Sequence, residues 1–305
     1  MTFNRWADRY LELAAEKRTP RDDIFMLKVL RAEFGSLPLE EITYAKIKVF
    51  ALKLRQIPVR QDADRLLSPA TCNRKLALLR HILRMAWKEG LIEKLPAVDL
   101  FQEDNERDQV LTDEEFTAMY EHAAPHLKPV LLCAWETGMR RGEILSLTWH
   151  RVNLKDDLII LESQDTKTKR RRQVPISQTL RGTLLSLRQA QGKVADIHQH
   201  VFLGVTRKPM KHIQKGFESA VERASLKDVH FHDLRRSFAT RKVAEGWDRD
   251  YVKAITGHRT DKVFARYNKP SLETLRAVVE GAANTSRVTL VLHGPGLPPA
   301  GVLSA

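Results

Sequence analysis

The sequence has few of the residues that build disulfides or cysteine-based metal sites, because only two of its 305 residues are cysteines. Cys72 and Cys133 both lie in apolar segments of helical period, which indicates buried free thiols rather than a disulfide or a metal-binding cysteine pair. Long apolar runs are also missing, since no stretch approaches the roughly 18 residues of a membrane-spanning helix. The first residues, MTFNRWADRY, lack the apolar centre of a secretion signal. We therefore expect a soluble, cytoplasmic protein.

Acidic residues are too few to balance the basic ones. The chain has 51 lysines and arginines against 38 aspartates and glutamates, which gives a formal net charge of +13. This excess suits a polyanionic partner, because each neutralised phosphate releases a condensed counterion. A basic protein without a nucleic-acid partner is the alternative that composition leaves open. The length suggests about two domains, and the 43% of hydrophobic residues is enough for a core in each.

Residues 1–105 predict a domain of short amphipathic helices. Their apolar faces recur at helical spacing: Phe3, Trp6, Tyr10 and Leu13; Ile24, Leu27, Leu30 and Phe34; Ile47, Phe50 and Leu54; Leu76, Leu79, Leu83 and Ala86. The last helix is the clearest, because Ser68-Pro69 is a typical start and Gly90 a typical end. Basic side chains on this helix either contact DNA or form an ordinary solvated face: Arg74, Arg80, Arg84 and Lys88.

A second domain is expected over residues 106–285. The polar, aperiodic segment 102–109 reads as a linker, and Thr112 to Glu115 forms a capping box that starts a helix. A strand, a basic hairpin and a second strand interrupt the helices between residues 158 and 176. Residues 286–305 are expected to be a flexible tail. The predicted fold class is therefore mainly α with a small antiparallel β-hairpin, that is, α+β.

The segment ETGMRRGEILSLTW holds the first candidate site residue. Thr137-Gly138 ends one helix, which places Arg140 at the N-terminus of the next, where backbone amides already favour an anion. Glu143 lies one turn further and could hold an arginine in place. Taken alone, Arg140 could equally be an ordinary surface arginine.

Two more basic segments follow. His232 and Arg235 in HFHDLRRSFATRK share a helix face, although that face could simply be exposed, or His230 and His232 could bind a metal. The hairpin tip, KTKRRR, suits phosphate contact but also a solvated turn. Its candidate DNA-contact residues are Lys169, Arg170, Arg171 and Arg172.

The order and spacing of these residues resemble the tyrosine recombinase (phage integrase) family. The matching positions are Arg140 in TGMRRGE, Lys167 in the hairpin, His232 and Arg235 in HDLR, His258 in TGHR and Tyr267 in ARYNK. Lys167 stands eight residues before Pro175, as in the family's hairpin, and Lys169 is its rival. The resemblance covers residues 110–270 by motif, and residues 1–105 resemble the family's core-binding domain in length and pattern only. Thr256 departs from the pattern, because an apolar residue usually precedes the glycine.

The resemblance implies that Tyr267 attacks a DNA phosphodiester and forms a 3′-phosphotyrosine bond. A phenol with a pKa of about 10 is only about 0.1% ionised at pH 7, so it depends on its neighbours. Arg140, Arg235 and His258 would stabilise charge on the non-bridging oxygens. Lys167 would protonate the leaving 5′-oxygen, His232 would assist proton transfer, and Glu143 would support an arginine. This chemistry requires no metal, ATP or other cofactor.

The implied partner is a double-stranded recombination site of a phage or mobile element, bound by a homotetramer, with a possible accessory DNA-bending or directionality factor. A protein of this kind would be associated with the nucleoid. Three alternatives stay open: a non-catalytic DNA-binding regulator of the same fold, an enzyme like a type IB topoisomerase, and, more remotely, a metal-dependent nuclease that uses His230 and His232. The family also includes members with a small N-terminal arm-binding domain, which this sequence does not suggest.

Overall fold

The structure is a computed structural model that describes residues 1–13, 20–59, 62–103, 109–163, 170–192 and 198–258. The chain divides into two compact units, Met1–Glu106 and Arg107–Ala305. Several predicted features lie outside the described residues: Lys167, Lys169, Tyr267 and the expected tail 286–305. In the part of the chain that is described, no helix is both long and apolar enough to cross a membrane.

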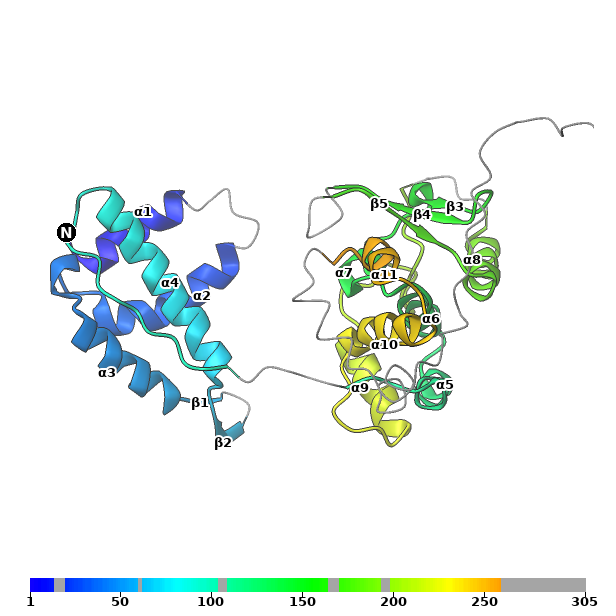
Figure 1. Cartoon of the computed structure of the whole chain (residues 1–305), viewed down its shortest axis with the longest axis horizontal. Coiled ribbons are helices and arrows are strands. Elements are labelled where there is room, and N and C mark those ends of the chain that lie inside the picture. The colour runs from blue at the N-terminus through cyan, green and yellow to red at the C-terminus, as the bar shows by residue number, and fades with distance from the viewer. Residues whose placement is uncertain (14–19, 60–61, 104–108, 164–169, 193–197, 259–305) are drawn as a thin grey trace, which may run out of the picture. The chain divides into compact units, whose positions relative to one another are not determined.

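The first unit is a bundle of four helices with a small two-stranded sheet (Figure 1). Its elements are α1 (Phe3–Leu13), α2 (Pro20–Phe34), η1 (Leu39–Glu41), α3 (Tyr44–Arg55), β1 (Pro58–Val59), β2 (Asp62–Leu66) and α4 (Pro69–Lys88). The side chain of Ser68 caps α4 by accepting a hydrogen bond from the Thr71 amide at 3.2 Å, as predicted. The apolar face of α4 is buried, and the indole of Trp6 on α1 donates to the Ile82 carbonyl at 3.0 Å.

Two residues of the predicted apolar faces are not in this core. Leu13 is 52% exposed and Ile24 is 45% exposed, whereas the other members of both faces are buried. Leu13 is the last residue of α1 and Ile24 lies near the start of α2. The apolar pattern in the sequence therefore continues beyond the residues that pack in the core. The strands β1 and β2 were not predicted, because segments this short and polar show no alternating pattern.

The second unit packs helices around a three-stranded antiparallel sheet in the order β3-β4-β5. Its elements are α5 (Asp113–His122), α6 (Lys128–Thr137), α7 (Arg141–Leu145), η2 (Trp149–Arg151), β3 (Val152–Asn153), β4 (Leu158–Leu161), β5 (Arg172–Pro175), α8 (Gln178–Gln191), α9 (Gln214–Arg223), α10 (Phe231–Ala244) and α11 (Arg249–Thr256). The register pairs Ile159 with Val174, and both are buried. The predicted capping box at Thr112 and Glu115 is present. The predicted fold class is confirmed, with β3 as an unpredicted third strand.

The arrangement of α6, α10 and α11 positions the candidate site. α6 is buried nearly all round and lies against α10, which in turn packs on α11. In Figure 1, α11 lies between α10 and β5. Because α11 also packs on β5, the ends of α6 and α11, the start of α7 and one strand of the sheet are brought to one place.

Candidate active site

Two helices end at this place with the same pair of residues, threonine and glycine. α6 ends at Thr137-Gly138 and α11 at Thr256-Gly257, and both glycines adopt left-handed backbone angles, with φ of 60° and 73°. A side chain would be strained there. At Gly138 it would also lie 2.6 Å from the ring of Phe238. Each helix therefore stops sharply, and its last carbonyls are turned toward the space beside α10.

Arg235 on α10 lies between these two helix ends. The residue is only 2% exposed, and its Nη1 donates to the carbonyls of Gly138 at 2.7 Å and Thr256 at 2.5 Å. Helix C-termini carry partial negative charge, which favours a cation there. Backbone groups thus hold the buried guanidinium, while its other terminal nitrogen, Nη2, faces Nε2 of His258 at 3.0 Å.

A second cluster of charges lies at the start of α7. Glu143 is 3% exposed, and its carboxylate accepts from the backbone and from the guanidinium of Arg140, both at 2.9 Å. The other terminal nitrogen of Arg140 donates to the carbonyl of Gly257 at 3.0 Å. Arg140 therefore stands at a helix N-terminus, as predicted, and is tied to the segment that carries His258.

Arg172 on β5 completes this cluster. Its terminal nitrogens donate to the two carboxylate oxygens of Glu143, at 3.1 and 2.6 Å, and its Nε donates to the carbonyl of Ile255 at 2.9 Å. Its side chain is only 8% exposed. The sequence predicts Arg172 as a DNA contact, but the structure turns its side chain inward. The physical reason is strand alternation, since Arg172 shares the inner face of β5 with buried Val174.

Burial and the neighbouring arginines set the ionisation of this site. Burial raises the pKa of Glu143, but the hydrogen bonds and charges of Arg172 and then Arg140 outweigh it, so the net pKa is lowered. Burial, then Arg235 and Arg140, lower the pKa of His258 to about 3. His258 is therefore neutral near pH 7, and the arginines leave the site with an excess of positive charge.

His232 lies on α10 one turn before Arg235. One side of the residue is open to solvent, yet the packed surroundings of its ring and then the charge of Arg235 lower its pKa. The charge of His232 in turn contributes to the lowered pKa of His258. The structure thus brings together Arg140, His232, Arg235 and His258, whereas Lys167 and Tyr267 lie outside the described residues.

His230 does not share a metal-type cluster with His232. It precedes α10 as its N-cap, and its side chain lies 3.8 Å from Asp228 and 4.0 Å from Asp233. Within the described ranges, no group of three or more histidines, cysteines or acidic residues could hold a metal ion. The described residues therefore give the metal-nuclease alternative no support.

The remaining candidate DNA contacts are at the surface. In the first unit the four basic residues of α4 are all exposed: Arg74, Arg80, Arg84 and Lys88. In the second unit Arg170 and Arg171 are exposed, and Arg171 lies 3.4 Å from Glu162. These six residues are exposed at the surface, unlike Arg172.

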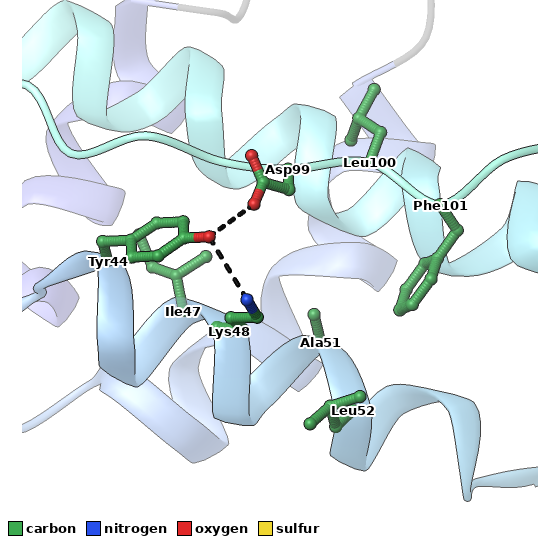
Figure 2. A pocket seen from close by; sticks show the side chains of 8 residues that line it. All are labelled: Tyr44, Ile47, Lys48, Ala51, Leu52, Asp99, Leu100 and Phe101. Atoms are coloured by element: carbon green, nitrogen blue, oxygen red, sulfur yellow. Dashed lines mark hydrogen bonds between the residues drawn. The ribbon is translucent and has the colours of Figure 1, made fainter.

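A cavity of about 110 Å³ in the first unit is lined by none of the predicted site residues (Figure 2). It lies between α3 and residues 99–101, where the hydroxyl of Tyr44 donates to Asp99 at 2.7 Å and Lys48 donates to that hydroxyl at 3.5 Å. Ligand sites usually span about 300–1,000 Å³. This cavity is much smaller, and we interpret it as a packing gap beside these two polar contacts.

Comparison with known proteins identifies related sequences and a shared fold. A family model described as "Phage integrase family" matches residues 109–273. The chain is 23% identical over 301 residues to the integrase of Salmonella phage P22, covering 88% of this chain and 76% of that protein. It is 27% identical over 256 residues to the tyrosine recombinase XerC of Bacillus subtilis, covering 78% and 80%. A lambda integrase tetramer bound to a Holliday junction has the same fold, with a TM-score of 0.72, 20% identity and coverage of 88% and 78%.

The fold and these relatives define the class of protein: a tyrosine recombinase, an enzyme that breaks and rejoins DNA strands. The chain belongs to the phage integrase family, whose model covers more than half of its sequence. Cleavage through a covalent bond to tyrosine is typical of this family.

Proposed function

We propose that the chain recombines specific double-stranded DNA sites, with Tyr267 as the nucleophile and Arg140, Lys167, His232, Arg235 and His258 as the other catalytic residues. One observation supports this most strongly. Arg235 is buried between two helix ends while its other terminal nitrogen faces His258, and Arg140 is bonded to the adjacent Gly257. Two guanidiniums and an imidazole around one space suit a phosphate with two non-bridging oxygens.

The proposed reaction is an exchange of one phosphate ester for another. The phenol of Tyr267 gives up its proton to water as its oxygen forms a bond to phosphorus. The bond to the 5′-oxygen breaks, and Lys167 gives that oxygen a proton. Arg140 and Arg235 stabilise the charge that gathers on the non-bridging oxygens. His232 assists the proton transfer, and Glu143 holds Arg140. Because a phosphotyrosine ester replaces the broken ester, the bond energy is retained, and a 5′-hydroxyl from a second strand can reverse the step without ATP. The arginines provide the charge stabilisation that other enzymes obtain from a metal.

The proposed assembly is a homotetramer on DNA in the cytoplasm, associated with the nucleoid. The lambda integrase tetramer on a Holliday junction supports this arrangement by its similar fold. The two units would contact the duplex through the basic side chains of α4 and of the hairpin, and an accessory DNA-bending or directionality factor could set the direction of the reaction.

Covalent trapping tests the proposed function. A site selected by binding from a pool of random duplexes is placed in a nicked suicide substrate and incubated with the protein in EDTA. We expect a protein–DNA adduct that survives denaturing electrophoresis and is lost in Tyr267→Phe. The absence of an adduct in the wild type, or its persistence in Tyr267→Phe, would overturn the assignment. Exchange of strands between two labelled duplexes then distinguishes a recombinase from a topoisomerase, and a non-catalytic regulator would bind without either product.

The basic side chains of α4 predict a steep dependence of DNA binding on salt. We assume that Arg80, Arg84 and Lys88 each neutralise one phosphate. Changing all three to glutamine should then make the negative slope of log affinity against log salt less steep by about 2.7, since each contact contributes about 0.9. The measurement is a salt titration of binding to one duplex.

The matched control removes the same charge from another helix of the same unit. Lys46, Lys48 and Lys53 on α3 are also exposed. We expect their triple glutamine variant to keep the wild-type slope. Equal slopes for the two triple variants would show that α4 has no special part in binding.

A further inference from the structure

Thr256 is the residue at which the sequence departs from the family pattern, and the structure gives its hydroxyl a specific place. The residue is fully buried. Its Oγ1 lies 2.7 Å from the carbonyl of Val252 and 2.8 Å from Nδ1 of His258. The same residue also offers its backbone carbonyl to Arg235 at 2.5 Å. Thr256 thus contacts both Arg235 and His258 directly.

The hydrogen-bond partners determine which nitrogen of His258 carries the proton. Nε2 faces a terminal nitrogen of Arg235 at 3.0 Å, and a guanidinium can only donate. Nε2 therefore accepts, so the proton of the neutral ring is on Nδ1 and is donated to Thr256. The hydroxyl in turn donates to the Val252 carbonyl. The result is a continuous chain of donors from Arg235 through His258 and Thr256 to the backbone of α11.

A phosphate bound in the site changes the hydrogen-bond partners of the His258 ring. When Arg235 turns its terminal nitrogen to a phosphate oxygen, Nε2 of His258 loses its donor and faces an acceptor. The ring then releases the Nδ1 proton to solvent and takes one up at Nε2, with no net change in charge. A hydroxyl both donates and accepts, so Thr256 can rotate and donate to Nδ1. An apolar side chain at this position could satisfy neither form.

We propose that Thr256 is a positioning residue, whose hydroxyl holds the His258 ring toward the scissile phosphate in both tautomers. This inference rests on the proposed function of His258. It assigns a role to the one position in the TGHR motif where this chain has a polar residue in place of an apolar one. The hydroxyl acts through His258 and is not expected to contact DNA.

The test compares Thr256→Val, which keeps the shape, with Thr256→Ser, which keeps the hydroxyl. We expect Thr256→Val to slow adduct formation on the suicide duplex by about 10–100-fold, on the scale known for groups that orient metal-bound histidines, with DNA affinity unchanged. Thr256→Ser should restore most of the rate. Equal rates for the wild type and Thr256→Val, or failure of Thr256→Ser to restore the rate, would overturn the proposal.

Nitrogen-15 NMR of the full-length protein without DNA provides a second measurement that a purely structural role would not change. The signals of His258 are assigned by comparison with His258→Gln. We expect a proton on Nδ1 that is protected from exchange in the wild type and in Thr256→Ser and is lost in Thr256→Val. An Nδ1 proton equally protected in Thr256→Val would contradict the proposal.

Thr137 offers a matched control for the loss of a buried threonine hydroxyl. It ends α6 as Thr256 ends α11, is equally buried, and donates to the carbonyl four residues earlier, but its hydroxyl contacts no histidine among the described residues. Thr137→Val should lower the melting temperature and leave the His258 signals unchanged. If Thr137→Val also removes the protected Nδ1 proton of His258, the loss of any nearby threonine hydroxyl has this effect, and the proposal fails. Failure of the wild type to form any adduct would instead refute the proposed function, while the NMR comparison would still test the contact.

Discussion

Exchange of Arg235 for lysine is expected to lower the rate of adduct formation by roughly 10³–10⁵-fold, the effect of an arginine that stabilises a transferring phosphoryl group. The arginine uses one terminal nitrogen for the carbonyls of Gly138 and Thr256 and leaves the other for His258 and the phosphate. A lysine ammonium has the same charge but a single nitrogen, so it can satisfy the carbonyls or reach the phosphate but cannot do both. The loss is therefore one of geometry rather than of charge.

Single-turnover cleavage of the suicide duplex at saturating protein measures this effect apart from DNA binding. Arg141→Lys is the control, because Arg141 is an exposed neighbour of Arg140 whose side chain donates to Gln214 at 3.2 Å. It should cleave at the wild-type rate. Thermal unfolding shows whether Arg235→Lys is folded at the temperature of the assay. A folded Arg235→Lys that cleaves within about tenfold of the wild type would show that the planar guanidinium is not needed.

Local signals in the sequence predicted much of the fold and part of the candidate site. Ser68, Thr112 and Gly138 mark helix ends through hydrogen bonds and backbone angles that depend on a few adjacent residues. The same kind of signal placed Arg140 at a helix N-terminus. His232 and Arg235 could be assigned to one turn of a helix because their spacing alone determines it.

The contacts that define the site depend on tertiary structure and could not be predicted in the same way. In a run of basic residues such as KTKRRR, the inward and outward positions differ only by the register of the strand, so the sequence predicts Arg172 as a DNA contact although its side chain faces inward. Val174, two residues on, is the signal that could have corrected it. The proposed role of Thr256 depends on the packing of α11 against α10, and no pattern within either helix predicts that contact.

Removal of Arg172 is expected to have the largest effect on stability. Arg172→Leu leaves the carboxylate of Glu143, which is 3% exposed, with only Arg140 to balance it. Breaking a buried ion pair by deleting one partner costs about 3–5 kcal/mol, so the free energy of unfolding should fall by about that amount. Urea unfolding monitored by tryptophan fluorescence measures it, because Trp135 and Trp149 lie in the core of the same unit.

The same pair predicts how stability depends on pH. The pKa of Glu143 is lower in the folded protein than its ordinary value, so the unfolded chain binds this proton more readily. The contribution of Glu143 is fully present above the ordinary glutamate pKa of about 4.3 and is lost as the pH falls through the lower folded value. Glu143→Gln should therefore unfold with a weaker dependence on pH below about 4.3 than the wild type. An unchanged dependence would show that Glu143 is not the group responsible.

The double variant Glu143→Leu/Arg172→Leu separates stability from catalysis. Replacing both members of a buried pair by apolar residues is often neutral or stabilising, so the double variant should recover most of the stability that Arg172→Leu loses. It should not recover cleavage, because Arg140 then keeps only its bond to the carbonyl of Gly257 and has no carboxylate to fix its second terminal nitrogen. Stability and adduct formation, measured on the same preparations, distinguish between the two roles of Glu143. Recovery of both would mean that Glu143 serves only to neutralise Arg172, whereas recovery of stability alone assigns it to the placement of Arg140.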